Sequence, residues 1–290
     1  MSNLELSIIL LYFKEKLEVL LECLSSISRS IGKLSYEIIL INNSNLDLNN
    51  LGLEKKYPIR IFSNNSNLGV AKSRNQAAKF IKAEYLLFLD LDMIAKNLAI
   101  EKLFKNFKNN LSIGAVGAKI ILEDGSLQNS FGRLPNRLFF FYELFLLSKK
   151  SKPIYRPTEV EFLSGGCLLL NKKTWELVGE FDENFSIYGW EDADWCKRAK
   201  EKKAKLIYFP EAEFIHLLHK SSLDLRVVEF YLSGIYYFKK HFGRLYAFFA
   251  LNFILVFSLF YFFILIFKKN KKEKKKNILR LVKSLAKFKL

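Results

Sequence analysis

Short apolar runs alternate with helix-like segments over the first two thirds of the chain. Polar residues rarely interrupt these runs, as in strands that are buried on both faces of a sheet. The predicted strands are 6–11, 37–41, 59–62, 85–89, 115–122, 161–170 and 205–209. The predicted helices are 17–27, 70–82, 172–178 and 192–200. This alternation predicts an α/β fold in which helices cover both faces of a parallel sheet.

A different pattern occupies the C-terminal part of the chain. Residues 245–267 form an apolar run in which only Asn252 and Ser258 are plainly polar. A helix of this length reaches about 34 Å, which is enough to cross the hydrocarbon core of a bilayer. We therefore expect a transmembrane or re-entrant membrane helix over 244–267. A buried core helix is the alternative, but core helices are rarely so long and apolar on every side.

The net charge of +17 is concentrated directly after this run. Residues 268–290 hold eleven Lys and Arg against one Glu, so this tail carries +10 of the total. A basic tail beside an apolar helix favours attraction to anionic lipid headgroups over binding of nucleic acid. We expect the amphipathic segment 278–288 to lie on the anionic leaflet of a membrane.

The position of the tail relative to the membrane stays open at the level of sequence. A single crossing by 245–267 would place the tail on the far side, against the usual excess of basic residues on the cytoplasmic side. A re-entrant or interfacial helix would keep both ends in the cytoplasm. Alternatively, Lys239, Lys240 and Arg244 on the near side set the orientation of a spanning helix. We favour the arrangement with both ends in the cytoplasm.

Composition excludes several classes of protein. Half of the residues are hydrophobic, so global disorder is excluded. Cys23, Cys167 and Cys196 are too few and too scattered for a disulfide framework or a thiolate zinc site. The aromatic segment 139–147 (FFFYELFLL) is expected to form a loop that is apolar enough to touch a membrane or a lipid acceptor.

Two carboxylates directly follow the apolar run 85–89. Asp90 and Asp92 lie two residues apart, so on an extended chain their side chains point to the same face. Parallel sheets bind ligands at the carboxyl ends of their strands, and carboxylates there suit Mg²⁺ or Mn²⁺ shared with a phosphate. Helix capping or a solvated surface charge is the alternative for an isolated D-x-D pair.

A second polar cluster lies at 189–194 (GWEDAD), with three carboxylates in four positions. A carboxylate held among other acids has a raised pKa and can accept a proton from a sugar hydroxyl as a general base. Stabilisation of a helix start by Asp192 is the alternative. Farther along, His216 and His219 lie close together, and an imidazole there either completes a metal site or is an ordinary structural histidine.

These motifs, taken in order, resemble glycosyltransferase family 2, which has the GT-A fold, and its rhamnosyltransferase-like bacterial members in particular. The resemblance covers about 6–243 and rests on SIILLYF, EIILINNSNLD, NLGVAKSRNQA, YLLFLDLD, the block from FLSGGC to EFIH, and YFKKHFG. It implies a Rossmann-like mixed sheet with helices on both faces. The implied organisation is a GT-A domain over 1–243, the membrane helix over 244–267 and a polybasic amphipathic tail over 268–290.

The resemblance also implies roles for individual residues. Those implied to bind the nucleotide sugar are Tyr12, Asn42, Asp47, Arg74 and Asp90. Those implied to line the acceptor site are Gly165, Gly166, Trp190 and Glu191. Asp92 and His216 are the implied metal ligands, and Asp192 is the implied catalytic base. Asn42 stands where the family usually has an Asp that contacts the base, so the choice between dTDP-, UDP- and GDP-sugars stays open.

The implied activity is the inverting, metal-dependent transfer of a sugar from a nucleotide-diphosphate donor. Mg²⁺ or Mn²⁺ is the implied cofactor, and a saccharide or lipid-linked saccharide of cell-envelope polysaccharide synthesis is the implied acceptor. The expected location is a bacterial or archaeal membrane with the catalytic domain on the cytoplasmic side, without nucleic acid as a partner. The alternatives are a polyprenyl-phosphate sugar synthase and a catalytically inert, membrane-bound scaffold of the same fold. The occurrence of Asp90, Asp92, Asp192 and His216 together favours an enzyme.

Overall fold

The computed structural model describes residues 4–110, 112–139, 153–185, 189–217, 223–266 and 272–288. The chain divides into two compact units, each built from segments that are separate in sequence. The first unit comprises Met1–Leu134, Lys150–Glu183 and Glu191–His219, and the second comprises Pro135–Lys149, Asn184–Trp190 and Lys220–Leu290. Most of the predicted apolar loop 139–147, and also His219, lie outside the described residues.

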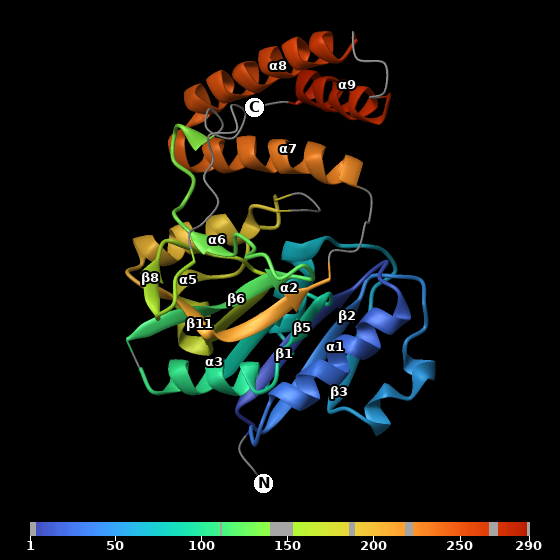
Figure 1. Cartoon of the computed structure of the whole chain (residues 1–290), viewed down its shortest axis with the longest axis vertical. Helices are drawn as coiled ribbons and strands as arrows, with labels where there is room; N and C mark the ends of the chain where they lie inside the picture. Colours follow the sequence, from blue (N-terminus) through green and yellow to red (C-terminus); the bar gives the residue numbers. More distant parts are fainter. Residues whose placement is uncertain are drawn as a thin grey trace. The chain divides into compact units, whose positions relative to one another are not determined.

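A mixed nine-stranded sheet is the centre of the first unit (Figure 1). Its strands are β1 (Leu6–Tyr12), β2 (Tyr36–Asn42), β3 (Ile59–Ser63), β4 (Tyr85–Leu89), β5 (Met93–Ala95), β6 (Ile113–Leu122), β8 (Thr158–Val160), β10 (Cys167–Asn171) and β11 (Lys205–His216). Their order is β3-β2-β1-β4-β10-β6-β11-β5, and β8 pairs with β11. Strands β3, β2, β1 and β4 are parallel, whereas β10 runs antiparallel between β4 and β6. Strands β7 (Phe131–Gly132) and β9 (Phe162–Leu163) form a separate pair.

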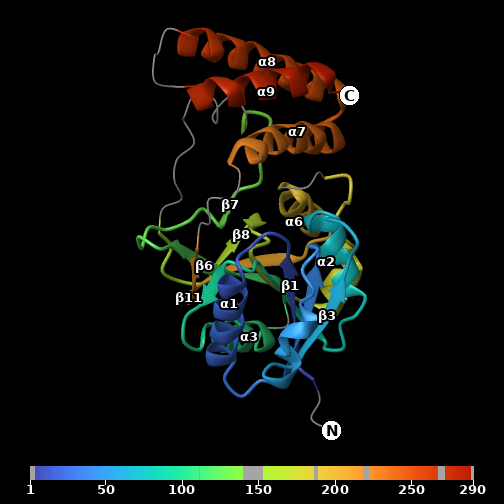
Figure 2. The ribbon, with the colours of Figure 1, turned by 90° about the vertical axis from the view of Figure 1, so that its right-hand side faces the viewer.

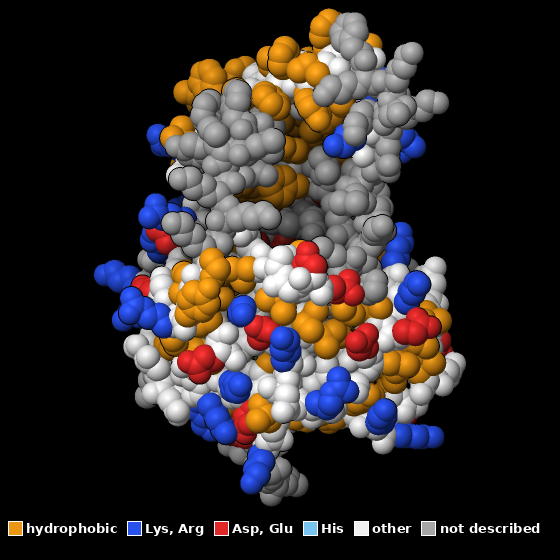
Figure 3. Space-filling view, viewed as in Figure 1, with side chains coloured by type: hydrophobic (Ala, Val, Ile, Leu, Met, Phe, Trp, Pro, Cys, Tyr) orange, Lys and Arg blue, Asp and Glu red, His pale blue; other side chains and the backbone are white. Residues whose placement is uncertain are grey.

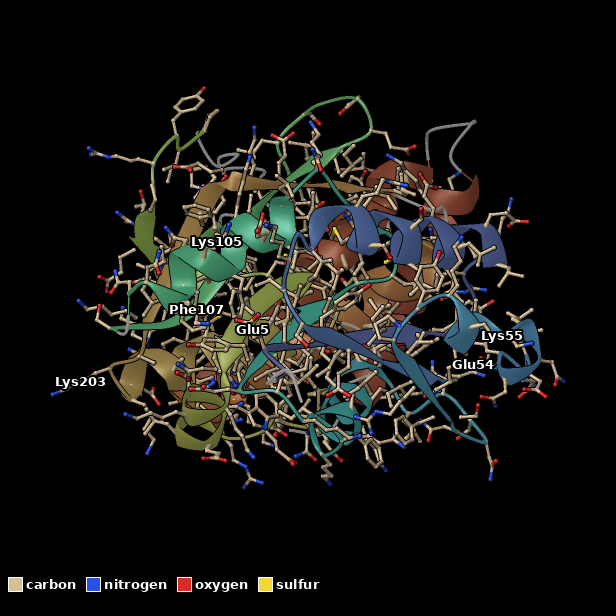
Figure 4. The ribbon with its side chains drawn as sticks, turned by 90° about the horizontal axis from the view of Figure 1, so that it is seen from below. Glu5, Glu54, Lys55, Lys105, Phe107 and Lys203 are labelled. Carbon is tan, nitrogen blue, oxygen red and sulfur yellow. The ribbon has the colours of Figure 1, made fainter. Side chains whose placement is uncertain are left out.

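Helices cover both faces of this sheet, as predicted. Helices α1 (Leu17–Ser30) and α3 (Ala99–Lys108) pack on one face, and Figure 4 shows them side by side from below. Helices α2 (Val70–Ala78), α5 (Lys172–Val178) and α6 (Glu191–Glu201) pack on the other face. In β1, Ile8 and Leu10 join the core under α1 and α3, while Ile9 joins the opposite core. The apolar runs are continuous because both faces of each central strand are buried.

The expectation of a purely parallel sheet is wrong, because β5, β8 and β10 run antiparallel to their neighbours. An apolar run that is buried on both faces has the same composition in either direction, so the pattern could not show this. The predicted strand 161–170 is in fact two strands, β9 and β10, separated by a turn that contains Gly165 and Gly166. The mixed sheet that the family resemblance implies is therefore the correct description.

The strand directions bring several polar chain segments to one edge of the sheet. Strands β1, β2 and β4 all end at this edge because they are parallel. The antiparallel β10 begins there, with Cys167 opposite Leu89. Strand β11 ends there as well, with His216 opposite Met93. The segments after Tyr12, Asn42 and Leu89, the turn before Cys167, and the end of β11 therefore share one edge.

Three helices make up most of the second unit: α7 (Leu223–Phe242), α8 (Arg244–Ile266) and α9 (Lys272–Lys287). They lie side by side in both ribbon views (Figures 1 and 2), and each contacts the other two. The predicted apolar helix is confirmed as α8, which is the one helix in the described part of the chain that is long and apolar enough to cross a membrane. The predicted amphipathic tail helix is α9.

Candidate active site

The two acidic residues after β4 have different partners. The backbone N–H of Asp90 donates to the carbonyl of Gly166 at 3.0 Å, which ties the end of β4 to the start of β10. Asp90 Oδ1 accepts a hydrogen bond from Arg74 Nη2 at 2.8 Å. Asp92 instead faces His216, with 3.1 Å between its Oδ2 and the imidazole Nε2. One carboxylate thus belongs to an arginine network and the other to a histidine pair.

The Asp92–His216 pair has the chemistry of a divalent metal site. On its other side, His216 Nδ1 lies 2.6 Å from Oε1 of Gln128, an arrangement that typically orients metal-binding histidines. In the described residues, no three His, Cys, Asp or Glu side chains are close enough to hold an ion by themselves. Mg²⁺ and Mn²⁺ sites that act on phosphates commonly use one or two protein ligands, and substrate oxygens supply the rest. The residues present therefore fit an ion that is shared with a diphosphate.

Arg74 is the centre of a buried network in the first unit. Its guanidinium donates to Asp90 Oδ1 at 2.8 Å, to the Gly165 carbonyl at 2.9 Å and to Glu191 Oε1 at 3.2 Å. It also lies against the rings of Phe88 and Phe181. Helix α2 carries Arg74 on its buried side, where the side chain is 4% exposed. In this structure the guanidinium connects carboxylates from two separate chain segments.

The Gly165–Gly166 turn fits closely around this network. A Cβ atom added at Gly165 would lie 2.3 Å from Arg74 Nη1, and one at Gly166 would lie 2.9 Å from Met93 Cε. Both distances are shorter than van der Waals contact. In this structure the small size of Gly165 makes room for the guanidinium, whereas the family resemblance attributes it to an acceptor sugar.

Asp192 lies in the first turn of α6 and touches the same turn. Its Oδ2 accepts the backbone N–H of Gly165 at 3.0 Å, and its Oδ1 accepts that of Ala193 at 2.8 Å. These bonds fix the orientation of the carboxylate, and each oxygen retains a further lone pair. Burial raises the pKa of Asp192 above its ordinary value, while the hydrogen bond from Gly165 and the charge of Arg74 oppose the shift. A fixed carboxylate with a raised pKa has the properties of a general base.

Glu191 is the neighbouring acid and is 5% exposed. Burial and the charge of Asp192 raise the pKa of Glu191 to about 7, and Arg74 partly offsets this. Glu191, next to Asp192 and Arg74, therefore gains or loses its proton near neutral pH. Asp194, the third acid of the cluster, is fully buried and pairs with Arg198 within α6, so its role is structural.

The residues implied to meet the nucleotide base lie at the ends of β1 and β2. The hydroxyl of Tyr12 donates to the Glu15 carbonyl at 2.9 Å. Asp47 is exposed and accepts from the Asn49 backbone and the Asn50 side chain, at the start of the short helix η1 (Asn49–Leu51).

Asn42 is buried, and contacts within the chain use its amide completely. Its Nδ2 donates to the Leu46 carbonyl at 2.7 Å and to Ser63 Oγ at 3.3 Å. Its Oδ1 accepts from both the backbone and the hydroxyl of Ser44. An amide has two donor hydrogens and two acceptor lone pairs, and all four have partners here. Asn42 therefore fixes the conformation of the 42–46 loop.

Trp190 belongs to the second unit. It has a left-handed backbone conformation with φ of 75°, and its ring packs against Phe139, Phe230 and Tyr237. The structure places its side chain in this aromatic cluster.

Comparison with known proteins identifies the family. The profile of glycosyl transferase family 2 matches residues 7–178, which is more than half of the chain. The chain belongs to glycosyl transferase family 2. A second profile, described as the N-terminal domain of galactosyltransferase, matches residues 147–220. The family 2 match contains Arg74, Asp90 and Asp92, and the second match contains Asp192 and His216.

Two curated relatives of this family 2 chain are bacterial and archaeal. The poly(ribitol-phosphate) β-N-acetylglucosaminyltransferase TarP of Staphylococcus aureus is 31% identical over 142 residues, which are 44% of this chain and 43% of TarP. An uncharacterized glycosyltransferase of Methanocaldococcus jannaschii is 29% identical over 131 residues, which are 43% of this chain and 45% of that protein. The chain thus matches less than half the length of these relatives.

Among solved structures, the chain is similar to a crystal structure of GalNAc-T7 with UDP, GalNAc and Mn²⁺. The TM-score is 0.59 at 16% sequence identity, and the match covers 82% of this chain and 51% of the other. At this identity the likeness concerns the fold, and it confirms the predicted GT-A fold.

Two features of the candidate site have no distinct signal in the sequence. Gln128 is a single amide in a loop, and only the structure places it beside His216. The contact between Gly165 and Arg74 joins residues 91 positions apart. Related sequences in which Gly165 and Arg74 change together would signal this contact.

Proposed function

We propose that this chain is an inverting, metal-dependent glycosyltransferase that moves a sugar from a nucleotide-diphosphate donor to a saccharide or lipid-linked saccharide. One observation carries the proposal. Arg74 and the Gly165–Gly166 turn join Asp90, on the donor side of the edge, to the acidic start of α6, where Asp192 is fixed. Asp90, which is proposed to bind the donor, and Asp192, which is proposed to deprotonate the acceptor, therefore belong to one hydrogen-bonded network.

Asp192 acts as the base in this proposal. One of its oxygens accepts the proton of the acceptor hydroxyl while the hydroxyl oxygen attacks the anomeric carbon. The bond from that carbon to the diphosphate oxygen breaks on the opposite face, and the nucleoside diphosphate leaves with the electron pair. A single displacement inverts the anomeric configuration and needs no covalent enzyme intermediate. The hydrogen bond from the Gly165 N–H keeps Asp192 oriented throughout.

Asp92 and His216 are the residues that would hold Mg²⁺ or Mn²⁺. When bound, the ion supplies positive charge that stabilises the diphosphate leaving group. Gln128 orients His216 so that one ring nitrogen faces Asp92. Asp90 pairs with Arg74 and is proposed to meet the ribose of the donor, as the family resemblance implies. The Mn²⁺ and UDP present with GalNAc-T7 support this assignment of the metal and donor class.

The relatives and the second unit support the proposed acceptor and location. The name of TarP describes transfer of a sugar to poly(ribitol-phosphate), which supports a cell-envelope glycan as the acceptor class. Nucleotide sugars are cytosolic, so the first unit is proposed to face the cytoplasm. The apolar helix α8 and the basic helix α9 are proposed to attach the chain to a membrane that contains anionic lipid.

A thermal-shift screen tests the donor and metal assignments together. The melting temperature of the full chain is measured with dTDP-, UDP- and GDP-sugars, each with Mn²⁺ or with EDTA. One base class should stabilise the chain only with Mn²⁺, by about 2.7 kcal/mol at a hundredfold excess over Kd. Asp92→Ala should abolish this gain, whereas Glu54→Gln, at an exposed acid labelled in Figure 4, should keep it. If Asp92→Ala kept the full Mn²⁺-dependent stabilisation of the unmodified chain, the metal role would be refuted.

A further inference from the structure

Helix α8 has one face that packs inside the second unit. Its buried residues are Ala247, Ala250, Ile254, Ser258 and Leu265, which recur along the whole helix at helical spacing. Three of these five are small, so neighbouring helices can approach closely. This face meets α7 and α9, both of which contact α8.

The opposite face of α8 is apolar and exposed. Phe249, Val256, Phe260 and Phe263 lie on it at spacings of seven, four and three residues, and each is between 59% and 65% exposed. Figure 3 shows hydrophobic side chains gathered over this helix in the upper part of the view. A continuous apolar face of this size on one helix requires an apolar partner.

Helix α9 returns along α8, which it contacts, and brings positive charge to the second unit. Leu281 and Leu285 are buried, whereas Lys276, Arg280, Lys283 and Lys287 are exposed on the opposite side of α9. The ammonium of Lys275 donates to the carbonyl of Ile266 at 3.3 Å, which ties the start of α9 to the end of α8. The two helices therefore form a hairpin whose surface is apolar along α8 and basic along α9.

This hairpin is incompatible with a single crossing of the membrane by α8. If α8 spanned the bilayer, α9 packed against it would carry its lysines into the hydrocarbon core, where isolated cations are strongly disfavoured. A hairpin that lies in the plane of the membrane has no such conflict. The apolar face of α8 then enters the boundary of the acyl chains, and the cations of α9 meet lipid phosphates.

We propose that the α8–α9 hairpin is an in-plane binding surface for an anionic lipid bilayer, with both of its ends on the same side. The proposal rests on the membrane attachment suggested above, but it does not depend on the transfer chemistry. Attachment is governed by two separable terms: apolar contact through α8 and electrostatic attraction through α9.

Vesicle flotation tests the binding surface. The full chain is mixed with sealed vesicles of phosphatidylcholine, with or without phosphatidylglycerol. We expect the unmodified chain to bind the anionic vesicles. A variant in which four cations are changed to Gln should bind them at least about tenfold more weakly, because each cation near an anionic surface contributes roughly fivefold to binding. The four are Lys276, Arg280, Lys283 and Lys287. The matched control changes Lys55, Lys56, Lys202 and Lys203 of the first unit to Gln and should bind as the unmodified chain does. No binding to either vesicle, an equal loss in the control, or a stable dimer that leaves vesicles unbound would overturn the proposal.

Thiol labelling tests the in-plane arrangement separately. The native Cys23, Cys167 and Cys196 are buried, and burial raises the pKa of each thiol, so they react slowly. Ala286→Cys, exposed on α9, should react with a membrane-impermeant maleimide in intact vesicles as fully as Asn45→Cys, exposed on the first unit. Reaction of Ala286→Cys only after the vesicles are dissolved would show a spanning α8. That result would overturn the in-plane arrangement but leave both membrane attachment and the proposed chemistry standing.

Discussion

At the scale of single residues, Glu191 makes stability depend on pH. Its pKa rises from 4.5 to about 7 on folding, so between these values the folded chain keeps a proton that the unfolded chain releases. Its stabilising contribution is present below pH 4.5 and is lost as the pH rises through 7. A glutamine does not titrate, so Glu191→Gln lacks this loss. Between pH 4.5 and pH 7, the unfolding free energy of Glu191→Gln should therefore rise by about 3 kcal/mol relative to that of the unmodified chain. Urea denaturation at several pH values measures the difference, and a difference that does not change with pH would contradict the assignment.

Asn42 offers a second test at this scale. Asn42→Asp restores the residue usual in the family, but it replaces the hydrogen bond donated to the Leu46 carbonyl by a contact between two acceptors and removes the one donated to Ser63. We expect a loss of about 1–3 kcal/mol, since buried polar groups lose their partners. Thermal unfolding measures the loss, and Asn45→Asp, in the exposed part of the same loop, is the control. An unchanged melting temperature for Asn42→Asp would mean that the amide does not hold the loop.

The sequence singles out Asp90, Asp92 and Asp192 as candidate site residues, because they follow an apolar strand or cluster together, but it does not predict their partners. That Arg74 contacts Asp90 and Glu191, and that the size of Gly165 accommodates Arg74, depends on how α2, β10 and α6 meet. Contacts between distant segments leave no local pattern in one sequence.

At the scale of elements, the Gly165–Gly166 turn couples β10 to α2 and α6. Gly165→Ala places a methyl group within 2.3 Å of Arg74 Nη1, so the guanidinium must move away from Asp90 and Glu191. We expect at least a tenfold loss of turnover, because small displacements of catalytic groups are costly. The double variant Gly165→Ala/Arg74→Lys tests whether the glycine acts through Arg74. Its turnover should be only slightly lower than that of Gly165→Ala alone. Fully additive losses in turnover would show that the glycine acts independently of Arg74.

The elements themselves were predicted to different degrees. Strand β4 and helix α5 have the predicted bounds because each apolar pattern ends at a clear polar boundary. Strand β11 continues past Phe209 to His216, since a register shift lets it cross the polar residues around Glu211. Helix α3 is not among the helices predicted from the sequence, although its apolar residues have regular helical spacing. Helix α7 is not among them either, because aromatic residues are mixed with polar ones along its length.

At the scale of the whole molecule, the charge of +17 is explained mainly by the second unit. A cation at the centre of a membrane helix costs about 2.5–3.5 kcal/mol, so the four exposed cations of α9 disfavour a spanning hairpin. The sequence left the choice between a spanning and an in-plane helix open. The packing of α9 along α8 favours the in-plane arrangement, which agrees with a basic tail on the cytoplasmic side.

The central claim is that this family 2 chain transfers a sugar with Asp192 as the base. The most direct test measures the release of nucleoside diphosphate from the donor by the unmodified chain and by Asp192→Asn, together with calorimetric affinity for the nucleotide. Asp192→Asn keeps the size of the side chain and removes the proton acceptor. We predict that turnover falls by about a hundredfold or more while affinity for the nucleotide is unchanged. Turnover of Asp192→Asn close to that of the unmodified chain would contradict the account.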